Sequence, residues 1–332
     1  MKPASVQEAD HGETLIEGLV RAELEPSPGP RSRLGAALRR FKADIRRLVR
    51  HPLGLIGLVL IACFALVALV HPILMATVWD RARFDPVVGF DRDQMPHPNP
   101  PTWRHLLGTD GFGRDVLSQL LAGARISFGA GMVGAVVAVA ISTLVGGAAG
   151  YSGGWVDAAL MGVADVFMLL PAPIVLLIFG LLLRMRWPLM AVTYGVLTGL
   201  GGQAIVVKSQ TLALKGKPFV EAARLAGGGS GHVIRRHILP ALMPIAVTHA
   251  VFTVVGAVLT ESLLSFLGRT RHYLSWGTMV WLGQQTFRLF TMKGQWHAIV
   301  PPAIAIMLFC SAFYLVGRAL DEVFNPRLRR EQ

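Results

Sequence analysis

Long apolar stretches alternate with polar segments along most of the chain. Six of them have the length of a membrane span, and they cover residues 53–79, 126–156, 158–183, 187–207, 238–260 and 298–317. A helix needs about 20 residues to cross a hydrocarbon core that is about 30 Å thick. The pattern therefore predicts an all-α polytopic membrane protein with six transmembrane helices.

Composition and the placement of charge support this topology. Of the 332 residues, 53% are hydrophobic and 16% are charged, and the mean hydropathy is +0.51. The net charge of +12 comes largely from basic residues before the first apolar stretch, between Lys208 and Arg236, and after the last stretch. Basic loops stay in the cytoplasm, so both termini are expected there, although Arg184 and Arg186 would then lie outside. Membrane orientation accounts for the charge, and no nucleic-acid partner is expected.

The chain divides into five segments. Residues 1–32 lack an apolar period, which predicts a flexible cytoplasmic tail. Residues 33–50 alternate apolar and basic side chains at helical spacing. This predicts a basic amphipathic helix on the inner leaflet or, alternatively, a solvated helix packed on the protein. The remaining segments are a first transmembrane helix with a long periplasmic segment (residues 51–125), a core of five transmembrane helices (126–320) and a cytoplasmic tail (321–332).

The periplasmic segment contains the sequence "HLLGTDGFGRDVLSQLLAGARIS", which begins at residue 105. Thr109 or Asp110 is expected to cap a helix that begins after Gly113, because a side-chain oxygen at that point accepts from free helix N–H groups. Asp110, Arg114 and Asp115 are expected to form a local charge network. A Ca²⁺ loop would need more oxygen ligands at closer spacing, so no metal is expected here.

Motifs for enzyme chemistry are incomplete. "GYSGG" at residues 150–154 matches the nucleophile turn of a serine hydrolase, but it joins two apolar helices and does not follow a strand. His232 and His237 are five residues apart and do not share a helix face. The chain contains neither a zinc-protease motif nor a phosphate-binding loop. We therefore expect no catalytic, cofactor or metal residues, and any ATP must bind to another chain.

The apolar stretches contain two further features. Gly146 with Gly150, and Gly195 with Gly199, have the spacing that lets membrane helices approach closely. Asp165 lies inside an apolar stretch, and Glu261 lies at the outer end of the fifth one. An ionisable group at membrane depth is a functional candidate, so both acids are possible functional residues, although structural pairing is the favoured interpretation.

The polar segment between the fourth and fifth stretches contains "PFVEAARLAGGGSGHVIRRHILP", residues 218–240. Pro218 suits the first turn of a short helix, and Gly227 suits the position just after its end. The glycines that follow permit a reversal into a second short helix that leads into the fifth span. Ala222 and Ala223 are expected to leave a shallow face. These features are expected of a short, rigid helical segment on which another protein docks.

The motifs "EAA" at residues 221–223, Gly227 and "HILP" at 237–240 resemble the EAA loop of bacterial ABC importer permeases. Further motifs resemble the C-type permease subunit of dipeptide, oligopeptide and nickel importers; they are "LGTDGFGRDVLSQLLAGARIS", "GYSGGWVDAALM", "ESLLSFLG", "SWGTMV" and "FNPRLR". The resemblance implies a type I ABC importer permease fold in the bacterial inner membrane. It also implies that the loop at residues 208–240 is the segment that docks on an ATPase.

The resemblance further implies partners and site residues. The partners are a second homologous permease, two ABC ATPase subunits that hydrolyse the ATP, an extracytoplasmic solute-binding protein and the lipid bilayer. The residues expected to couple to the ATPase are Glu221, Ala222, Ala223, Arg224, Gly227, His237, Leu239 and Pro240. Those expected to meet the partner permease or the binding protein are Gly108, Thr109, Asp110, Gly113, Arg114 and Asp115. Peptides are the expected substrate; the alternatives are a permease for nickel chelates or other small solutes, and a secondary carrier.

Overall fold

The computed structural model describes residues 45–95, 97–183, 185–268, 273–289 and 296–324. The predicted tail at 1–32, residues 33–44 of the predicted amphipathic helix, and residues 325–332 of the C-terminal tail lie outside these ranges. The described residues from Leu48 onward form one compact unit. The regular elements of the described ranges are helices, apart from an isolated bridge between Thr109 and Asp115.

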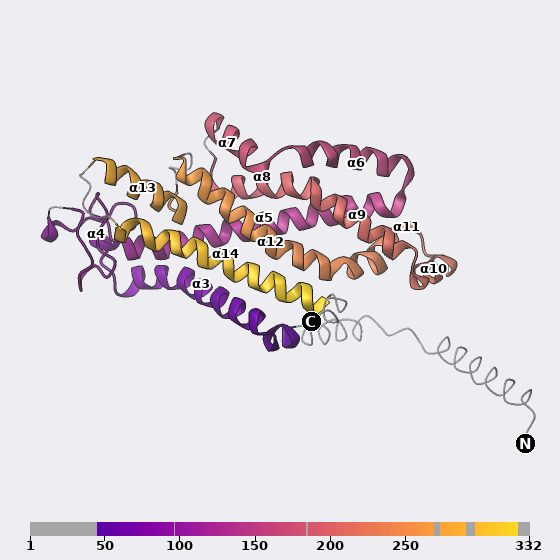
Figure 1. Ribbon diagram of the computed structural model, residues 1–332, viewed down its shortest axis with the longest axis horizontal. Helices are drawn as coiled ribbons and strands as arrows, with labels where there is room; N and C mark the ends of the chain where they lie inside the picture. Colours follow the sequence, from indigo (N-terminus) through magenta and orange to yellow (C-terminus); the bar gives the residue numbers. More distant parts are fainter. Residues whose placement is uncertain (1–44, 96, 184, 269–272, 290–295, 325–332) are drawn as a thin grey trace, which may run out of the picture. The chain divides into compact units, whose positions relative to one another are not determined.

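Four helices are long and apolar enough to cross a membrane, and two bent pairs add one span each. The four are α3 (Pro52–Thr77), α5 (Val116–Ser152), the run Ser230–Phe266 that ends in α12 (Leu239–Phe266), and α14 (Trp296–Phe324) (Figure 1). The bent pairs are α6 (Gly154–Leu169) with α7 (Ala172–Leu182), at 75°, and α8 (Trp187–Leu200) with α9 (Gly202–Lys215), at 44°. With each pair counted as one span, the predicted all-α fold with six transmembrane segments is confirmed.

Each bend has a local cause. Leu170 precedes Pro171 and has an extended backbone, because the proline ring disfavours a helical residue before it. The second bend falls at Gly201, whose ψ of −131° is outside the helical region. The apolar composition continues through both bends, so hydrophobicity alone did not indicate them.

The central helix is α5, which contacts α3, α6, α8, α9 and α12. Its glycines allow this packing, since a Cβ on Gly146 would lie 2.4 Å from the carbonyl oxygen of Ala204 in α9. A Cβ on Gly195 of α8 would lie 2.7 Å from the carbonyl oxygen of Gly134 in α5. Both predicted small-residue motifs therefore lie at helix contacts, as expected for close approach in a membrane protein.

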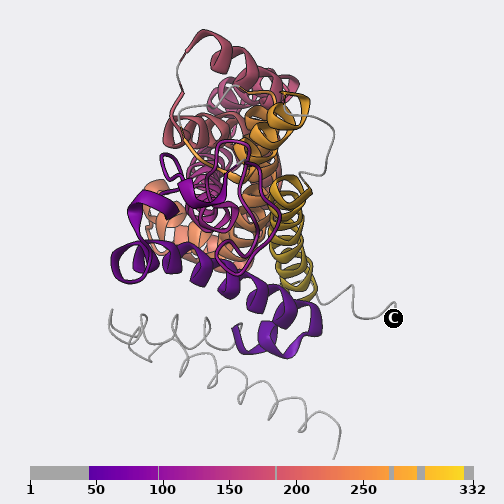
Figure 2. The same ribbon diagram turned by 90° about the vertical axis from the view of Figure 1, so that its left-hand side faces the viewer.

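The two ends of the bundle differ in structure. One end, called the loop end, holds α10 (Pro218–Leu225) and α11 (Ser230–Val233). The other, called the cap end, holds α13 (Trp276–Leu289) and the cap, defined as residues 80–115, with α4 (Arg81–Phe84) and the 3-10 helix η1 (Arg92–Gln94). Figure 2 views the cap end, where the irregular segments of the cap lie in front of the bundle.

Aromatic packing fixes α13 on the cap end. The indole of Trp276 is buried and donates a hydrogen bond of 2.9 Å to the carbonyl of Leu120 in α5. Its ring centroid lies 5.5 Å from those of Phe64 in α3 and Phe309 in α14. Edge-to-face contacts of this kind stabilise a core beyond their buried area. One side chain thus joins α13 to three long helices.

Some boundaries differ from the sequence-based expectation. The second span begins at Val116 and not at residue 126, and the fourth extends to Lys215, well beyond residue 207. Both helices extend beyond the apolar stretch into sequence that contains more polar residues. A hydropathy pattern does not identify such residues as part of the same helix. The polar loop, defined from here on as residues 216–238, is accordingly shorter than the predicted 208–240.

Candidate functional site

The polar loop folds as the predicted short helix followed by a turn. α10 has Pro218 in its first turn and ends at the cap residue Ala226. Gly227 follows with a φ of +81°, a left-handed conformation that favours glycine. The N–H of Gly228 donates to the carbonyl of Ala223 (3.0 Å) and the N–H of Gly227 to that of Arg224 (2.9 Å). This is a Schellman motif, and it confirms the predicted role of Gly227 in ending the helix.

After the glycines, α11 continues through a π turn at Ile234–Ile238 into α12 without a break. The predicted second short helix is therefore present, and it forms one continuous run with the fifth span. Of the candidate residues here, Leu239 is half-buried and Pro240 is exposed at the start of α12. Both lie at the base of the loop.

α10 has two distinct faces. On its outer face Leu225 is 86% exposed and Phe219 is 44% exposed, and Ala222 and Ala226 are also exposed. These four residues are called the α10 patch. Ala223, four residues after Phe219, is half-buried and packs on the loop core. Ala222 is exposed, and the shallow docking face expected from the two alanines stays a prediction.

The inner face of α10 packs on the ends of three long helices. Val220 is fully buried in a cluster with Val207 of α9, Ile238 and Leu242 of the α12 run, and Tyr151 at the end of α5. Burial of this apolar surface holds the loop to the bundle. Val220 of α10 therefore shares one buried core with residues of α5, α9 and the α12 run.

The polar candidates of the loop are placed around this core. Glu221 and Arg224 are exposed on α10. His237 is half-buried, and its ring centroid lies 6.5 Å from that of Phe219 and 6.1 Å from that of His232. The loop thus brings His237 next to Phe219 of α10, while Arg224 lies against Tyr151 of α5.

At the cap end, Asp110 organises the predicted charge network. Its Oδ1 accepts from the backbone N–H groups of Phe112 and Arg114, both at 2.9 Å, and its Oδ2 accepts from Arg114 Nε and Gln119 Nε2, both at 2.8 Å. Gly108 and Gly113 have φ angles of +77° and +79°, which the tight turns at this motif require. The Asp110–Arg114 pair is therefore confirmed as a local network.

Asp115 does not join that network. It is the N-cap of α5, and its Oδ1 accepts from the N–H of Ser118 at 2.6 Å. The prediction that Thr109 or Asp110 would be the cap is wrong, because the helix begins at Val116, two residues later than expected, and the oxygens of Asp110 already accept hydrogen bonds within the turn before it. Thr109 is buried, and its hydroxyl contacts the ring of His97 and the N–H of Asn99.

Sequence reasoning missed a buried histidine between two acids. His105 Nδ1 lies 2.7 Å from Asp115 Oδ2, and its Nε2 lies 3.1 Å from Asp91 Oδ2. His105 and both acids are about 1% exposed. A histidine that contacts a carboxylate through each ring nitrogen connects Asp91 to Asp115 at the start of α5. His105 is the first residue of the motif quoted above, but no spacing pattern relates it to Asp91, fourteen residues earlier.

The two acids have opposite pKa shifts. Burial raises the pKa of Asp115, although the N–H of Ser118 and the ring of His105 oppose the shift. For Asp91, burial also raises the pKa, but the N–H of Asp93, His105 and Arg83 together outweigh burial and hold the pKa below its usual range. A buried carboxylate with several donors favours its ionised form. The surroundings of the cluster therefore favour the ionised form of Asp91 and disfavour that of Asp115.

The two acids within the helical bundle belong to different helices, α6 and α12. Asp165 is exposed on α6 and forms no ion pair with any residue that the structure describes. Glu261 is fully buried near the end of α12, where its Oε1 accepts from the hydroxyl of Ser265 at 2.6 Å. Glu261 thus has a hydrogen-bond partner, and the roles of both acids stay predictions.

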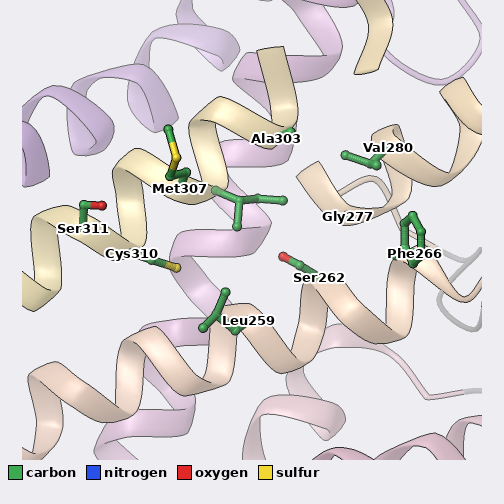
Figure 3. Close-up of a pocket in the computed structure, with 10 residues that line it drawn as sticks. Leu259, Ser262, Phe266, Gly277, Val280, Ala303, Met307, Cys310 and Ser311 are labelled. Carbon is green, nitrogen blue, oxygen red and sulfur yellow. The ribbon is translucent and has the colours of Figure 1, made fainter. Parts of the chain in front are cut away.

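An open groove of about 510 Å³ lies between α12, α13 and α14 (Figure 3). Leu259, Phe266 and Met307 contribute to its apolar lining, into which the hydroxyl of Ser262 points. A solute site usually combines an apolar wall with several convergent polar groups. This groove instead fits an apolar side chain or a lipid acyl chain.

The helical bundle and the polar loop both lie within regions that match known proteins. The family model described as "Binding-protein-dependent transport system inner membrane component" matches residues 142–330. The chain is 32% identical over 288 residues to the dipeptide transport system permease protein DppC of Bacillus subtilis, which covers 86% of this chain and 85% of that protein. It is 31% identical over 284 residues to a protein of Brucella suis named as a putative peptide permease, which covers 85% and 89% of the two chains.

Proposed function

Because the chain belongs to the family of binding-protein-dependent transport system inner membrane components, we propose that it is a permease subunit of an ATP-driven importer of dipeptides or oligopeptides. It is a multi-pass inner membrane protein, and its family names the dependence on a binding protein. The peptide substrate is supported by the names of the relatives, which cover most of the chain.

The complete importer contains four kinds of subunit in this proposal. A second, homologous permease forms the other half of the pathway, two ATPases bind and hydrolyse ATP, and a solute-binding protein delivers the peptide from outside. Both termini and the polar loop lie in the cytoplasm, and the cap lies outside. The basic residues around the loop, Lys215, Lys217, Arg235 and Arg236, support this orientation.

The observation that carries the coupling role is the α10 patch. An eight-residue helix that exposes Phe219 and Leu225 beside two alanines presents an apolar surface with little relief. Exposed apolar residues grouped in this way mark a protein contact. Charged residues on both sides of α10 keep it out of the hydrocarbon core, so we assign the patch to the ATPase. Glu221 and His237 supply polar contacts to the ATPase, whereas Arg224 contributes to coupling through its contact with Tyr151.

The packing of α10 supports a rigid-body mechanism. Closure of the ATPase dimer around ATP displaces α10, and the buried contacts of Val220 and Ile238 make the ends of α5, α9 and α12 follow it. Interfaces that switch between two packed states amplify such small shifts. The spans then open the pathway alternately to the two sides of the membrane.

The cap is the surface proposed for the binding protein. It exposes apolar side chains that the bundle does not cover, including Trp103 at 97% and Val88 at 78%. The network around Asp110 and the cluster around His105 hold the segment that carries them in one conformation. A rigid segment with exposed aromatic and aliphatic groups suits a protein contact.

The proposal is tested by mild-detergent purification of the tagged chain from its native membranes. The wild type should retain ATP-hydrolysing subunits. Leu225→Glu places a charge in the α10 patch and should reduce their recovery at least tenfold. Ser230→Glu, which adds the same charge beyond the glycine turn, should have little effect. Recovery of the wild-type chain without an ATPase, together with uptake driven by an ion gradient, would instead support a secondary carrier.

A further inference from the structure

Tyr151 lies where the polar loop meets the central helix. It belongs to the last turn of α5 and is 6% exposed. The chain then turns at Gly153 and Gly154, whose φ angles are +70° and +57°, before α6 begins. No neighbouring atom would contact a Cβ on either glycine. Tyr151 is therefore the last buried side chain of α5 before a loosely packed junction, since Ser152 is exposed.

Two cations approach this tyrosine, one just before the polar loop and one within α10. Arg224, in the last turn of α10, lies with its guanidinium carbon 4.9 Å from the ring centroid, and its Nε donates to the hydroxyl at 3.3 Å. Lys215, the last residue of α9, donates from Nζ to the Tyr151 carbonyl at 2.6 Å and lies 5.6 Å from the ring centroid. Cations within about 6 Å of an aromatic face are attracted by the ring quadrupole.

The apolar side of the ring completes the connection. Tyr151 packs in the same buried cluster as Val220 of α10 and Val233 of α11. A displacement of α10 therefore reaches α5 through the polar contacts of Arg224 and through the apolar contacts of Val220. α6, the next helix in the chain, is separated from these contacts by the two glycines.

α5 can carry such a displacement across the whole bundle. Its 37 residues contain no proline, and at 1.5 Å per residue they span about 56 Å. The helices α3, α12 and α14, by contrast, each contain proline within the helix. The far end of α5 is capped by Asp115, which contacts His105 of the cap. One unbroken helix thus joins the polar loop to the cap.

We propose that Tyr151 is the positioning residue through which movement of α10 is transmitted to α5 and, along α5, to the cap. The proposal rests on the proposed function, since it presumes that an ATPase moves α10. Tyr151 would not touch solute or ATP. It would set how much of the ATPase movement reaches the surface on which the binding protein docks.

The test measures coupling in the complete complex, reconstituted in proteoliposomes with its ATPases and binding protein. The readouts are the number of labelled dipeptides taken up per ATP hydrolysed and the stimulation of ATP hydrolysis by the binding protein. Tyr151→Leu, which removes the ring and the hydroxyl, should lower the ratio at least tenfold. Tyr151→Phe keeps the ring and should stay within about threefold of wild type. Tyr314→Leu, at a half-exposed tyrosine on α14, is the matched control and should keep the wild-type ratio.

These readouts separate transmission from a structural role, because poor folding lowers the amount of complex and leaves its ratio unchanged. If the complex with Tyr151→Leu does not assemble, Arg224→Gln is the second variant. Recovery of the ATPase with Arg224→Gln is the control for docking. Arg224→Gln should lower the number of dipeptides taken up per ATP about threefold. The proposal is overturned if an assembled Tyr151→Leu complex takes up dipeptides per ATP within twofold of wild type. If that complex does not assemble, the same result with Arg224→Gln overturns it. If the wild-type complex shows no ATP-dependent uptake, the proposed function fails first and the role of Tyr151 fails with it.

Discussion

Replacement of His105 by alanine should loosen the cap while leaving the helical bundle in place. The histidine contacts the buried acids Asp91 and Asp115 at 3.1 and 2.7 Å. Its removal eliminates two hydrogen bonds to charged groups, each of which contributes about 1.5–3 kcal/mol. Removing one partner of a buried ionic contact costs about 3–5 kcal/mol. The two estimates agree on a loss of roughly 3–5 kcal/mol in the free energy of opening the cap.

Hydrogen exchange measured by mass spectrometry provides the assay. Each 1.4 kcal/mol changes an opening equilibrium about tenfold, so cap amides whose exchange requires this opening should exchange at least about 100-fold faster in His105→Ala. Peptides from α12 should be unchanged and serve as the internal standard. The N–H of Ser118, which Asp115 holds at 2.6 Å, lies in the most informative peptide.

Arg104→Ala is the control for this experiment. Arg104 forms an ion pair of 3.5 Å with Asp93, but the two side chains are 59% and 55% exposed. Exposed pairs contribute at most about 1 kcal/mol, which corresponds to a change of about fivefold or less. If His105→Ala accelerated exchange of the cap no more than Arg104→Ala does, the buried cluster would not hold the cap, and the reasoning would be refuted.

Three further predictions concern the acids, the turn and the helix contact. The lowered pKa of Asp91 stabilises the folded cap above the ordinary pKa of 3.8, and this stabilisation is lost as the pH falls. The raised pKa of Asp115 has the opposite effect: it stabilises the folded cap while Asp115 is protonated, and this stabilisation is lost as the pH rises through the folded pKa. Asp115→Asn leaves Asp91, so the cap should open more often as the pH falls below about 4. Asp91→Asn leaves Asp115, so the cap should open less often on the same acidification. Both are measured by hydrogen exchange, corrected for its intrinsic pH dependence. Gly227→Ala forces a left-handed conformation on alanine at a cost of about 1–2 kcal/mol, so uptake should fall several-fold at normal abundance; unchanged uptake would contradict the importance of this turn. Gly146→Ala meets the carbonyl of Ala204 and should lower the yield of folded protein, whereas Gly147→Ala, where nothing lies within 4 Å, should not; equal yields would argue against close packing there.

The sequence indicated local features well because each depends on neighbouring residues. Pro218 and Gly227 determine where α10 begins and ends, and the turn chemistry of both is visible in a few letters. The spacing of Gly146 and Gly150 likewise identified a helix contact without any knowledge of the partner helix. The six membrane segments followed from length and hydropathy alone.

Features that depend on tertiary contacts were not predictable in this way. His105 reaches Asp91 only because the cap folds back on itself, and no periodic pattern records that contact. The partial burial of Ala223 depends on where the loop core lies. The contact of Tyr151 with Arg224, 73 positions later in the chain, arises from the packing of α5 against α10, and neither motif that contains Tyr151 indicates it.

The most direct test of the central claim is uptake of a labelled dipeptide by proteoliposomes that contain the purified complex and its binding protein. The account predicts that accumulation requires ATP on the side of the membrane where the α10 patch lies. It should persist when ion gradients are dissipated and be lost in Leu225→Glu. Accumulation without ATP that follows a proton or sodium gradient would contradict it. So would ATP-dependent uptake that is unaffected by Leu225→Glu, because the α10 patch would then not be the surface that couples to the ATPase.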